Sequence, residues 1–396
     1  MKLITAFLFV LTLSILSFGQ TKWPTKAWPS SQPIALGLNK DSLNALNKEL
    51  ASGKYGNVDG MLVIRHGMVA FEKSYKHNYE DIYKNEASIK SALNSGDPGG
   101  PYNYFNPWWH PYFHNTDLHT LQSVTKTITS VIIGLAITRK DFPDLNTPIL
   151  KFFDTSSVQN IDIRKRSITI KHLLTMTAGF KWNEELPYED PRNDGSIMEA
   201  NYDWVKYVID KPMADEPGKV FNYNGGATQI LAHIFRVATG KDLEEYAQEY
   251  LFKPLGIQDY YWKRSPSGLV DSEGGLYLDK KDLAKIFYLY LKKGKWENQQ
   301  LIRTDYVSES VIPYVRLSEN QGYGYKWWLY YYGNKSTDVV WRGSGFGGQT
   351  PMIFPEYDMV VIFTAWNILP NKPNTSTKFL VTKILHSIND YNGAKK

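Results

Sequence analysis

One serine and one lysine stand three residues apart where an apolar helical pattern begins, an arrangement that can support nucleophilic catalysis. Ser123 and Lys126 form the only Ser-x-x-Lys in the chain, and residues at i and i+3 share one face of a helix. A serine hydroxyl becomes a nucleophile when a neighbouring base takes its proton. Free lysine has a pKa of about 10.4, so we expect a closed, electropositive cleft that lowers the Lys126 pKa. The alternative is an ordinary first-turn serine beside a solvated lysine.

Two later segments carry groups suited to the same chemistry. Tyr223 stands on a Gly-rich turn ahead of a helical pattern, where its phenol can relay a proton if nearby lysine charge lowers its pKa. Residues 343–348 read Gly-Ser-Gly-Phe-Gly-Gly between two strand patterns, and an N–H at such an edge can bind an oxyanion. The alternatives are a tyrosine packed on its loop and a tight glycine turn.

Other chemistries find less support in the chain. It contains no Gly-x-Ser-x-Gly, no His-Glu-x-x-His, no phosphate-binding loop and no dinucleotide fingerprint. His110, His114 and His119 are a possible metal-binding group. Pro111 and the lack of a nearby glutamate on the same face argue against it. We therefore expect no metal and no organic cofactor.

Composition narrows the classes further. The 396 residues include 45 Lys plus Arg, 40 Asp plus Glu and no cysteine. A net charge of +5 without a basic block does not indicate a nucleic-acid partner. The absence of cysteine excludes disulfides, a cysteine nucleophile, Cys-ligated zinc and iron–sulfur clusters. With 42% hydrophobic and 21% charged residues the chain can bury a large core in two or three lobes, and 12 Trp, 27 Tyr and 18 Phe make it rich in aromatics.

The first nineteen residues resemble an export signal. Lys2 precedes an apolar run, 3–18, that ends in Ser17-Phe18-Gly19, which is typical of a signal peptide cleaved after Gly19. The run is short for a membrane span, and no later segment is long and apolar enough for one. Without a cysteine for lipid attachment, we expect a periplasmic or secreted protein. The alternative is an uncleaved N-terminal anchor.

Strand patterns occur at both ends of the chain and helical patterns lie between them. The sequence therefore predicts an α+β fold: an antiparallel sheet built from both chain ends and flanked by helices, with an inserted mainly helical lobe. We place the sheet lobe at 20–118 and 291–396 and the helical lobe, with the Ser123 helix, at 119–290. Helices are expected at 41–50, 124–139, 170–176, 203–210, 227–239, 243–251, 281–293 and 376–391, and strands within 61–71, 325–332, 338–341, 350–354 and 359–366. The cleft between the lobes is the expected site.

Taken in order, the three segments resemble the serine β-lactamase/penicillin-binding-protein superfamily. The branch that they resemble is the class C-like one, with its esterases and 6-aminohexanoate-dimer hydrolases. The sequence Gly-Phe-Gly-Gly-Gln at 345–349 resembles the 6-aminohexanoate-hydrolase branch more than true class C β-lactamases. Further segments share the resemblance, which spans about residues 40–390: 60–67, 172–179, 251–257, 274–276 and 355–361. The resemblance implies the β-lactamase/transpeptidase-like fold.

The resemblance also implies a role for each motif residue. Ser123 matches the family nucleophile, Lys126 its motif lysine and Tyr223 the tyrosine of the second motif. The backbone N–H groups of Ser123 and Phe346 correspond to the oxyanion hole. The second motif departs from the family's Tyr-x-Asn, because Gly225 stands where the asparagine is expected.

The third motif departs as well. Its usual Lys or His, Thr and Gly align with Gly343, Ser344 and Gly345, so the cation is absent, although Arg342 is adjacent and could replace it. The missing cation weakens the case for β-lactam or peptidoglycan substrates. Substrate contacts are expected from the third motif and from an acidic-aromatic loop in the helical lobe: Ser344, Gly345, Arg342, Trp182 and Tyr188.

The sequence thus predicts an exported serine hydrolase that cleaves a small ester or amide through a Ser123 acyl-enzyme. Lys126 and Tyr223 are expected to transfer the protons, and the small-molecule substrate is the expected partner. Two alternatives stay open: a β-lactamase or D,D-peptidase, and a non-catalytic penicillin-binding-like module. The aromatic segment 102–113 before the Ser123 helix either overhangs the cleft or packs between the lobes.

Overall fold

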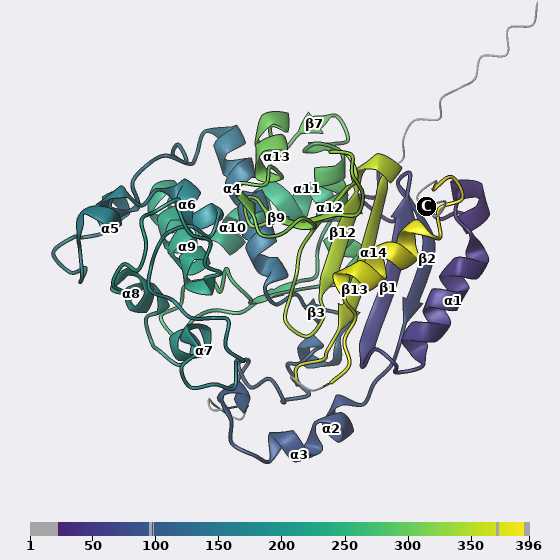
Figure 1. The fold of residues 1–396 in the computed structure, drawn as a ribbon, viewed down its shortest axis with the longest axis horizontal. Helices are drawn as coiled ribbons and strands as arrows, with labels where there is room; N and C mark the ends of the chain where they lie inside the picture. Colours follow the sequence, from purple (N-terminus) through teal and green to yellow (C-terminus); the bar gives the residue numbers. More distant parts are fainter. Residues whose placement is uncertain (1–22, 95–96, 98, 370–371, 392–396) are drawn as a thin grey trace, which may run out of the picture.

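An antiparallel sheet dominates one side of the molecule. The computed structural model describes residues 23–94, 97, 99–369 and 372–391, so the predicted signal segment lies outside the described residues. Within those ranges the main sheet has eight strands in the order β2-β1-β13-β12-β11-β10-β9-β8 (Figure 1). Its strands are β1 (Val58–Arg65), β2 (Met68–Ser74), β8 (Val315–Arg316), β9 (Gln321–Tyr323), β10 (Trp328–Tyr331), β11 (Val339–Arg342), β12 (Thr350–Phe354) and β13 (Met359–Ala365). Every neighbouring pair is antiparallel.

The central strands β1 and β13 are apolar on both faces because both faces are covered. Met61 and Val63 pack with α1 (Lys40–Ala51) and α14 (Thr377–Leu385). Their neighbours Leu62 and Ile64 belong to the larger core on the other face, with α4 (Val124–Arg139) and α12 (Lys280–Leu291). Side chains alternate across a strand, so one short apolar run supplies both layers.

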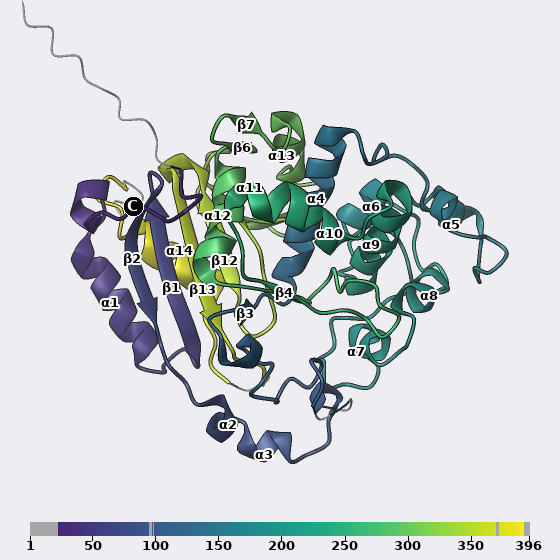
Figure 2. The same cartoon turned by 180° about the vertical axis from the view of Figure 1, so that it is seen from behind.

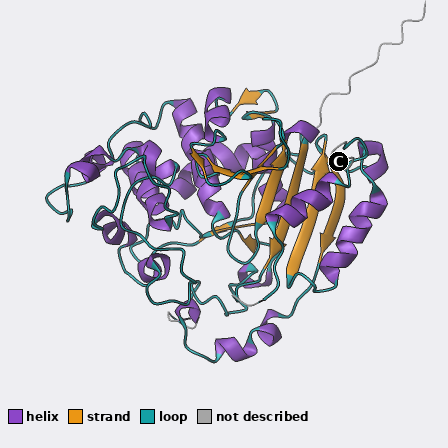
Figure 3. Cartoon of the chain, viewed as in Figure 1, coloured by secondary structure: helices purple, strands orange, loops and turns teal. Residues whose placement is uncertain are grey.

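Helices fill the other side of the molecule, as Figure 3 shows in purple. The longer ones are α4 (Val124–Arg139), α9 (Gly225–Thr239) and α12 (Lys280–Leu291). The shorter ones are α2 (Tyr79–Ile82), α3 (Lys84–Ala87), α5 (Ile163–Ser167), α6 (Ile170–Leu174), α7 (Asp194–Glu199), α8 (Trp204–Ile209), α10 (Leu243–Ala247), α11 (Lys253–Leu255) and α13 (Thr304–Ser310). Seen from behind, α4 lies between the sheet and α9 (Figure 2). It is buried from Val124 to Ala136, as expected of a central helix that is apolar on all sides.

A small second sheet connects the start of α4 to a later loop. It has the order β3-β5-β4, with β3 (His119–Thr120), β4 (Tyr261–Trp262) and β5 (Leu276–Leu278). A third sheet is the pair β6 (Lys295–Trp296) and β7 (Gln299–Gln300). Because β3 pairs with β5, the residues before β5 are held beside the first turn of α4.

The predicted α+β architecture is confirmed: strands from both chain ends form one antiparallel sheet, and a mainly helical segment is inserted between them. The exact lobe boundaries stay a prediction. α12, which we placed in the helical lobe, contacts β1, β12 and β13 of the sheet. Across the described residues, none of the helices combines the length and apolarity needed to cross a membrane.

Candidate active site

The first turn of α4 brings Ser123 and Lys126 into direct contact. Ser123 immediately precedes the helix and Lys126 lies in its first turn. The Lys126 Nζ donates a hydrogen bond to the Ser123 Oγ over 2.8 Å. Lys126 is only 1% exposed, so the solvated-lysine alternative is wrong. The amine is placed where it can exchange a proton with the serine hydroxyl.

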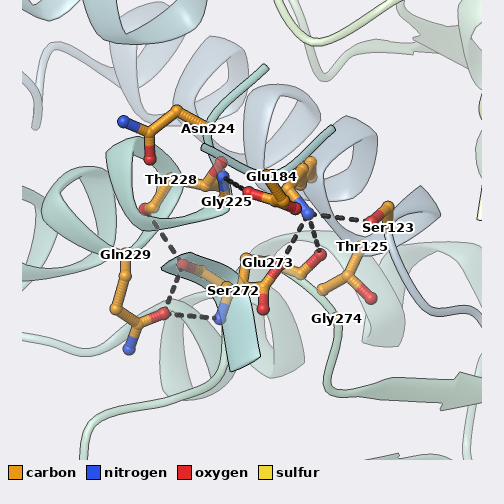
Figure 4. A network of polar contacts seen from close by, with 12 residues as sticks. Ser123, Thr125, Glu184, Asn224, Gly225, Thr228, Gln229, Ser272, Glu273 and Gly274 are labelled. Atoms are coloured by element: carbon orange, nitrogen blue, oxygen red, sulfur yellow. Dashed lines mark hydrogen bonds and ion pairs between the residues drawn. The ribbon is translucent and has the colours of Figure 1, made fainter. Parts of the chain in front are cut away.

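The other partner of Lys126 is a glutamate that sequence reasoning did not single out. The Lys126 Nζ donates to the Glu273 Oε2 over 2.5 Å and to the Glu273 backbone carbonyl over 3.0 Å (Figure 4). Glu273 lies in the segment just before β5, and it too is buried. A buried ammonium needs such acceptors because it has lost its water.

The charge around Lys126 is therefore the reverse of the expected electropositive cleft. Burial by itself would lower the Lys126 pKa, but the Glu273 carboxylate, with smaller contributions from Tyr223 and Glu184, raises the pKa above its ordinary value. Lys126 rests as an ammonium. An amine that accepts the Ser123 proton must first give up one of its own.

Tyr223 lies in the loop before α9 and is close to Lys126. Its ring faces the Lys126 Nζ, which lies 5.2 Å from the ring centroid. The next residue, Asn224, caps α9 by accepting a hydrogen bond from the Ala227 N–H. We expected lysine charge to lower the Tyr223 pKa, but burial outweighs Lys126 and the nearby Ser123 hydroxyl, and the pKa is raised. Tyr223 rests as a neutral phenol.

The glycine segment after β11 packs against the start of α4. A Cβ on Gly345 would lie 2.4 Å from the Leu121 carbonyl oxygen, and one on Gly343 would lie 3.1 Å from the Val124 methyl groups. This close approach requires glycine at 345 and leaves little room for a side chain at 343. Among the described residues, nothing accepts a hydrogen bond from the N–H of Ser123 or of Phe346. Both N–H groups are thus available to an oxyanion.

A hollow of about 550 Å³ adjoins this segment. Arg342, Ser344, Gly345 and Phe346 line it from the sheet side, and Glu184 and Tyr188 line it from the helical side. Trp182 is buried instead, and its indole N–H donates to the Glu184 Oε2 over 2.9 Å.

Arg342 is 7% exposed, and within the described part of the chain no side chain or carbonyl accepts a hydrogen bond from its guanidinium. The Arg342 Cζ lies 5.6 Å from the centroid of the Trp328 ring. Burial lowers the Arg342 pKa to about 10. An unpaired buried cation that faces a hollow is suited to an acceptor group on a ligand.

The aromatic segment before α4 packs behind the third motif. Tyr104 and His110 stack with ring centroids 5.0 Å apart, and His110 stacks on Trp366 at 4.9 Å. The Phe346 ring meets Tyr104 edge-on at 6.0 Å.

The three histidines of the metal hypothesis have separate environments. His110 lies in that stack, His114 stacks on Trp108, and His119 pairs with Asp59 over 3.0 Å. No group of three or more potential metal ligands occurs among the residues that the structure places.

Sequence reasoning missed three charged residues that surround Lys126. Besides Glu273 these are Glu184, which accepts from the Gly225 N–H over 2.7 Å, and Lys326, whose Nζ contacts the Met176 Sδ at 3.1 Å. Burial, and then the charge of Lys126, lowers the Lys326 pKa well below its ordinary value. The one available signal was for Glu273, which with Asp271 places two acids inside the otherwise apolar and glycine-rich run 269–278.

Comparison with known families settles the affiliation of the chain. The profile of the family described as Beta-lactamase matches residues 113–380, about two thirds of the chain. The chain belongs to the Beta-lactamase family. The predicted membership of the serine β-lactamase/penicillin-binding-protein superfamily is confirmed.

Individual relatives of this β-lactamase-family protein include acyltransferases and hydrolases. The "Monacolin J acid methylbutanoyltransferase" of Aspergillus terreus is 29% identical over 155 residues, which are 36% of this chain and 37% of that protein. The chain thus covers little more than a third of this relative. A Bacillus anthracis protein assigned as a 6-aminohexanoate-dimer hydrolase superposes with a TM-score of 0.61 at 18% identity, covering 92% of this chain and 87% of the other. EstCE1, "a hydrolase with promiscuous acyltransferase activity", superposes with a TM-score of 0.62 at 13% identity, covering 90% of this chain and 100% of the other. At these identities the two structures show a shared fold.

Proposed function

We propose that the protein is a serine hydrolase that cleaves a small ester or amide through an acyl-enzyme on Ser123. The observation that carries the proposal is the 2.8 Å contact between the Lys126 Nζ and the Ser123 Oγ, buried beneath Tyr223. An inert module has no need of a nucleophile, a proton acceptor and free N–H donors in one place. Membership of a family that contains hydrolases and acyltransferases supports the same reaction class.

The chemistry follows from these groups. The Ser123 Oγ attacks the carbonyl carbon, and its proton passes to the Lys126 amine once the resting ammonium has given up a proton of its own, either directly or through the Tyr223 hydroxyl, which passes on one proton as it takes up another. The carbonyl oxygen becomes an oxyanion that the N–H groups of Ser123 and Phe346 bind. The leaving alcohol or amine takes the proton from Lys126. Water then attacks the acyl carbon and releases the acyl group, its proton passing through the Tyr223 hydroxyl to the free Lys126 amine. Loss of one oxyanion donor typically lowers the rate by about 10²–10³-fold.

We assign substrate binding to the hollow beside the third motif. We place the acyl portion along Ser344 and Gly345, with Tyr188 on the opposite wall. Arg342 offers the hollow an unpaired cation and stands in for the missing motif cation. Trp182 acts on the substrate indirectly, because its indole N–H is already bound to Glu184.

Covalent labelling tests the proposal directly. The purified protein is treated with a fluorophosphonate and, separately, with penicillin, and the intact mass is measured for the wild type and for Ser123→Ala. We expect a fluorophosphonate adduct on the wild type and none on Ser123→Ala. A wild type that forms no adduct would overturn the proposal. A long-lived penicillin adduct would favour the penicillin-binding alternative, and rapid β-lactam turnover would favour a lactamase. A panel of esters and amides then ranks the leaving groups.

Acyl transfer to an alcohol is the second candidate activity. The names of the Aspergillus terreus relative and of EstCE1 both include acyl transfer. An acyl-enzyme on Ser123 can be released by an alcohol as well as by water, since both attack the same carbonyl carbon. Adding a small alcohol to the ester assay discriminates the two: transfer gives a new ester, whereas hydrolysis gives only the acid.

Export is proposed from residues 1–19 alone. The mature protein would begin at Gln20 and act in the periplasm or medium. Intact mass of protein recovered from a secreting host tests this, because cleavage after Gly19 removes nineteen residues.

A further inference from the structure

The second motif lacks its usual asparagine, and two carboxylates fill the space where that side chain would stand. A Cβ on Gly225 would lie 2.8 Å from the Glu273 Oε2 and 3.2 Å from the Glu184 Oε2. Figure 4 shows both glutamates converging beside Gly225. Position 225 is therefore glycine for a reason of space: a side chain here would displace the carboxylate that binds Lys126.

The loop that carries Glu273 is fastened to both helices of the site. On the α4 side, the Thr129 hydroxyl donates to the Ser272 carbonyl over 2.9 Å, and the Leu276 N–H donates to the Thr125 hydroxyl over 3.2 Å. On the α9 side, the Gln229 Oε1 accepts from the Ser272 N–H over 3.1 Å.

Within the loop, the Asp271 carboxylate accepts from the N–H groups of Glu273 and Gly274 over 3.1 and 2.8 Å. All these groups are buried. The loop backbone is therefore held firmly, and the Lys126 Nζ in turn binds the Glu273 carboxylate that projects from it.

We propose that Glu273 is a positioning residue of the nucleophile: it holds Lys126 against Ser123 and takes up the ammonium proton when Lys126 must act as the base. The inference rests on the proposed function, because it assigns a task within the Ser123 reaction. Two contacts carry it, the 2.5 Å distance from the Lys126 Nζ to the Glu273 Oε2 and the 2.8 Å distance to the Ser123 Oγ. The Lys126 amine thus contacts both the Ser123 hydroxyl, which must lose a proton, and the Glu273 carboxylate, which can hold one.

The proton steps balance. A Lys126 N–H bond breaks as an O–H bond forms on Glu273, which leaves a neutral amine and a neutral acid. The Ser123 O–H bond then breaks, its oxygen bonds to the carbonyl carbon, the proton goes to the amine lone pair, and the carbonyl π pair moves onto oxygen. When the leaving group departs it takes a proton from Lys126, and Glu273 returns its proton to the amine. No other reactant is needed.

Other ionisable groups face this pair from every neighbouring segment. The groups that interact electrostatically with Lys126 or Glu273 are Glu184, Glu199, Asp271, Lys326, Tyr104, Tyr188 and Tyr223. Tyr102 and Lys263 interact in turn with Asp271. Glu184 matters most, because it is the second carboxylate at Gly225. Burial, opposed by Lys126 and reinforced by Glu273, raises the Glu184 pKa. Among the described residues, Glu273 is the one whose carboxylate lies within hydrogen-bond distance of the Lys126 Nζ.

The test is the pH dependence of Ser123 acylation in Glu273→Gln. The glutamine keeps the side-chain shape but cannot take the proton, and Lys126 loses the charge that raises its pKa. We expect the rate of fluorophosphonate labelling at pH 7 to fall by about 10²-fold, the low end for loss of a general base. The deficit should shrink as pH rises toward 10 and the amine loses its proton. Glu273→Asp, which keeps a carboxylate, should retain more activity and the wild-type profile.

A matched control is Asp282→Asn. Asp282 forms a 2.9 Å ion pair with the buried Lys285 on α12, away from the site. Removing it disturbs a comparable lysine–acid pair but should leave the pH profile of labelling unchanged.

A motif exchange gives a second, independent readout. Gly225→Asn alone should lose labelling, because its Cβ would stand 2.8 Å from the Glu273 Oε2. In the Glu273→Ala background, which empties that space, Gly225→Asn should regain part of the rate lost by Glu273→Ala. This double variant also serves if Glu273→Gln fails to fold.

The outcomes separate the two proposals. Suppose that the wild type is labelled, and that Glu273→Gln is labelled either at the wild-type rate or at a rate reduced by the same factor at every pH. Either result would overturn the role proposed for Glu273 and leave the proposed hydrolase function standing. Failure of the motif exchange to recover activity also counts against that role. A wild type that does not label at all removes both proposals together.

Discussion

Lys126 and Arg342 are both buried at the candidate site, and of these two only Lys126 has an acid beside it. Lys126 is bound by Glu273, whereas the Arg342 guanidinium has no hydrogen-bond acceptor among the residues that the structure describes. Removing a cation from water without a partner destabilises the folded state. An unpaired buried arginine is consistent with a ligand-binding role, because binding sites often sacrifice stability for function.

At this scale we expect Arg342→Met to stabilise the protein while it weakens substrate binding. Methionine keeps much of the volume and removes the desolvated charge, so the free energy of unfolding should rise by about 1 kcal/mol or more. The same variant should raise KM, with a smaller change in kcat, for any ester found in the substrate panel. Chemical denaturation and steady-state kinetics measure the two effects.

Arg65→Met is the matched control for that substitution. Arg65 is equally buried, but its guanidinium donates to the carbonyls of Leu36, Gly37 and Tyr357. Its loss should destabilise the protein, because three acceptors lose their donor. If Arg342→Met destabilises as much as Arg65→Met, Arg342 is a structural residue.

At the scale of elements, local patterns were enough to predict the helices of the site but not its charge. The spacing of apolar residues in α4 and the turn before α9 are local signals, and both helices lie within two residues of the predicted bounds. Glu273 is 147 residues from Lys126, and tertiary contacts that include the pairing of β3 with β5 bring it there. No spacing rule reports such a contact, which is why the expected electropositive cleft was wrong while Ser123, Lys126 and Tyr223 were found together.

The element-scale prediction concerns Asn224, which links the second motif to α9. Its side chain accepts from the Ala227 N–H over 2.8 Å. Asn224→Ala should reduce the free energy of unfolding by about 1 kcal/mol, the usual cost of losing an N-cap. Asn224→Asp, which can still cap the helix, should keep the stability. An Asn224→Ala protein with wild-type stability in urea would show that the cap is not needed.

At the scale of the whole molecule, the aromatic segment before α4 joins the two lobes. The Tyr104 ring lies parallel to Trp366, which follows β13 of the sheet, with ring centroids 6.2 Å apart. Its hydroxyl donates to the Glu199 carboxyl in α7 over 3.0 Å. One tyrosine thus contacts both lobes and also the ring of Phe346. The aromatic excess of the sequence is used here for packing beside the site, which composition alone could not distinguish from a substrate-binding wall.

Glu199, the acid that the Tyr104 hydroxyl contacts at this junction between the lobes, should make the stability of the whole protein depend on pH. Burial, and then the negative charge of Glu273, raises the Glu199 pKa from 4.5 to about 8. Between those values the folded protein keeps a proton that the unfolded chain releases, so the free energy of unfolding falls as pH rises from about 4.5 to about 8. The slope from one such group is at most about 1.4 kcal/mol per pH unit.

Glu199→Gln removes this titration while keeping an acceptor for Tyr104, so its stability relative to the wild type should increase steadily from pH 5 to pH 8. Denaturant unfolding of both proteins across that range measures the difference. Glu319→Gln, which alters an exposed side chain beyond the reach of this junction, should give a difference that does not change with pH. A Glu199→Gln difference equally flat with pH would mean that Glu199 is already ionised in the folded protein, and that the charge of the buried acids is balanced by Lys263 and Lys126 rather than avoided.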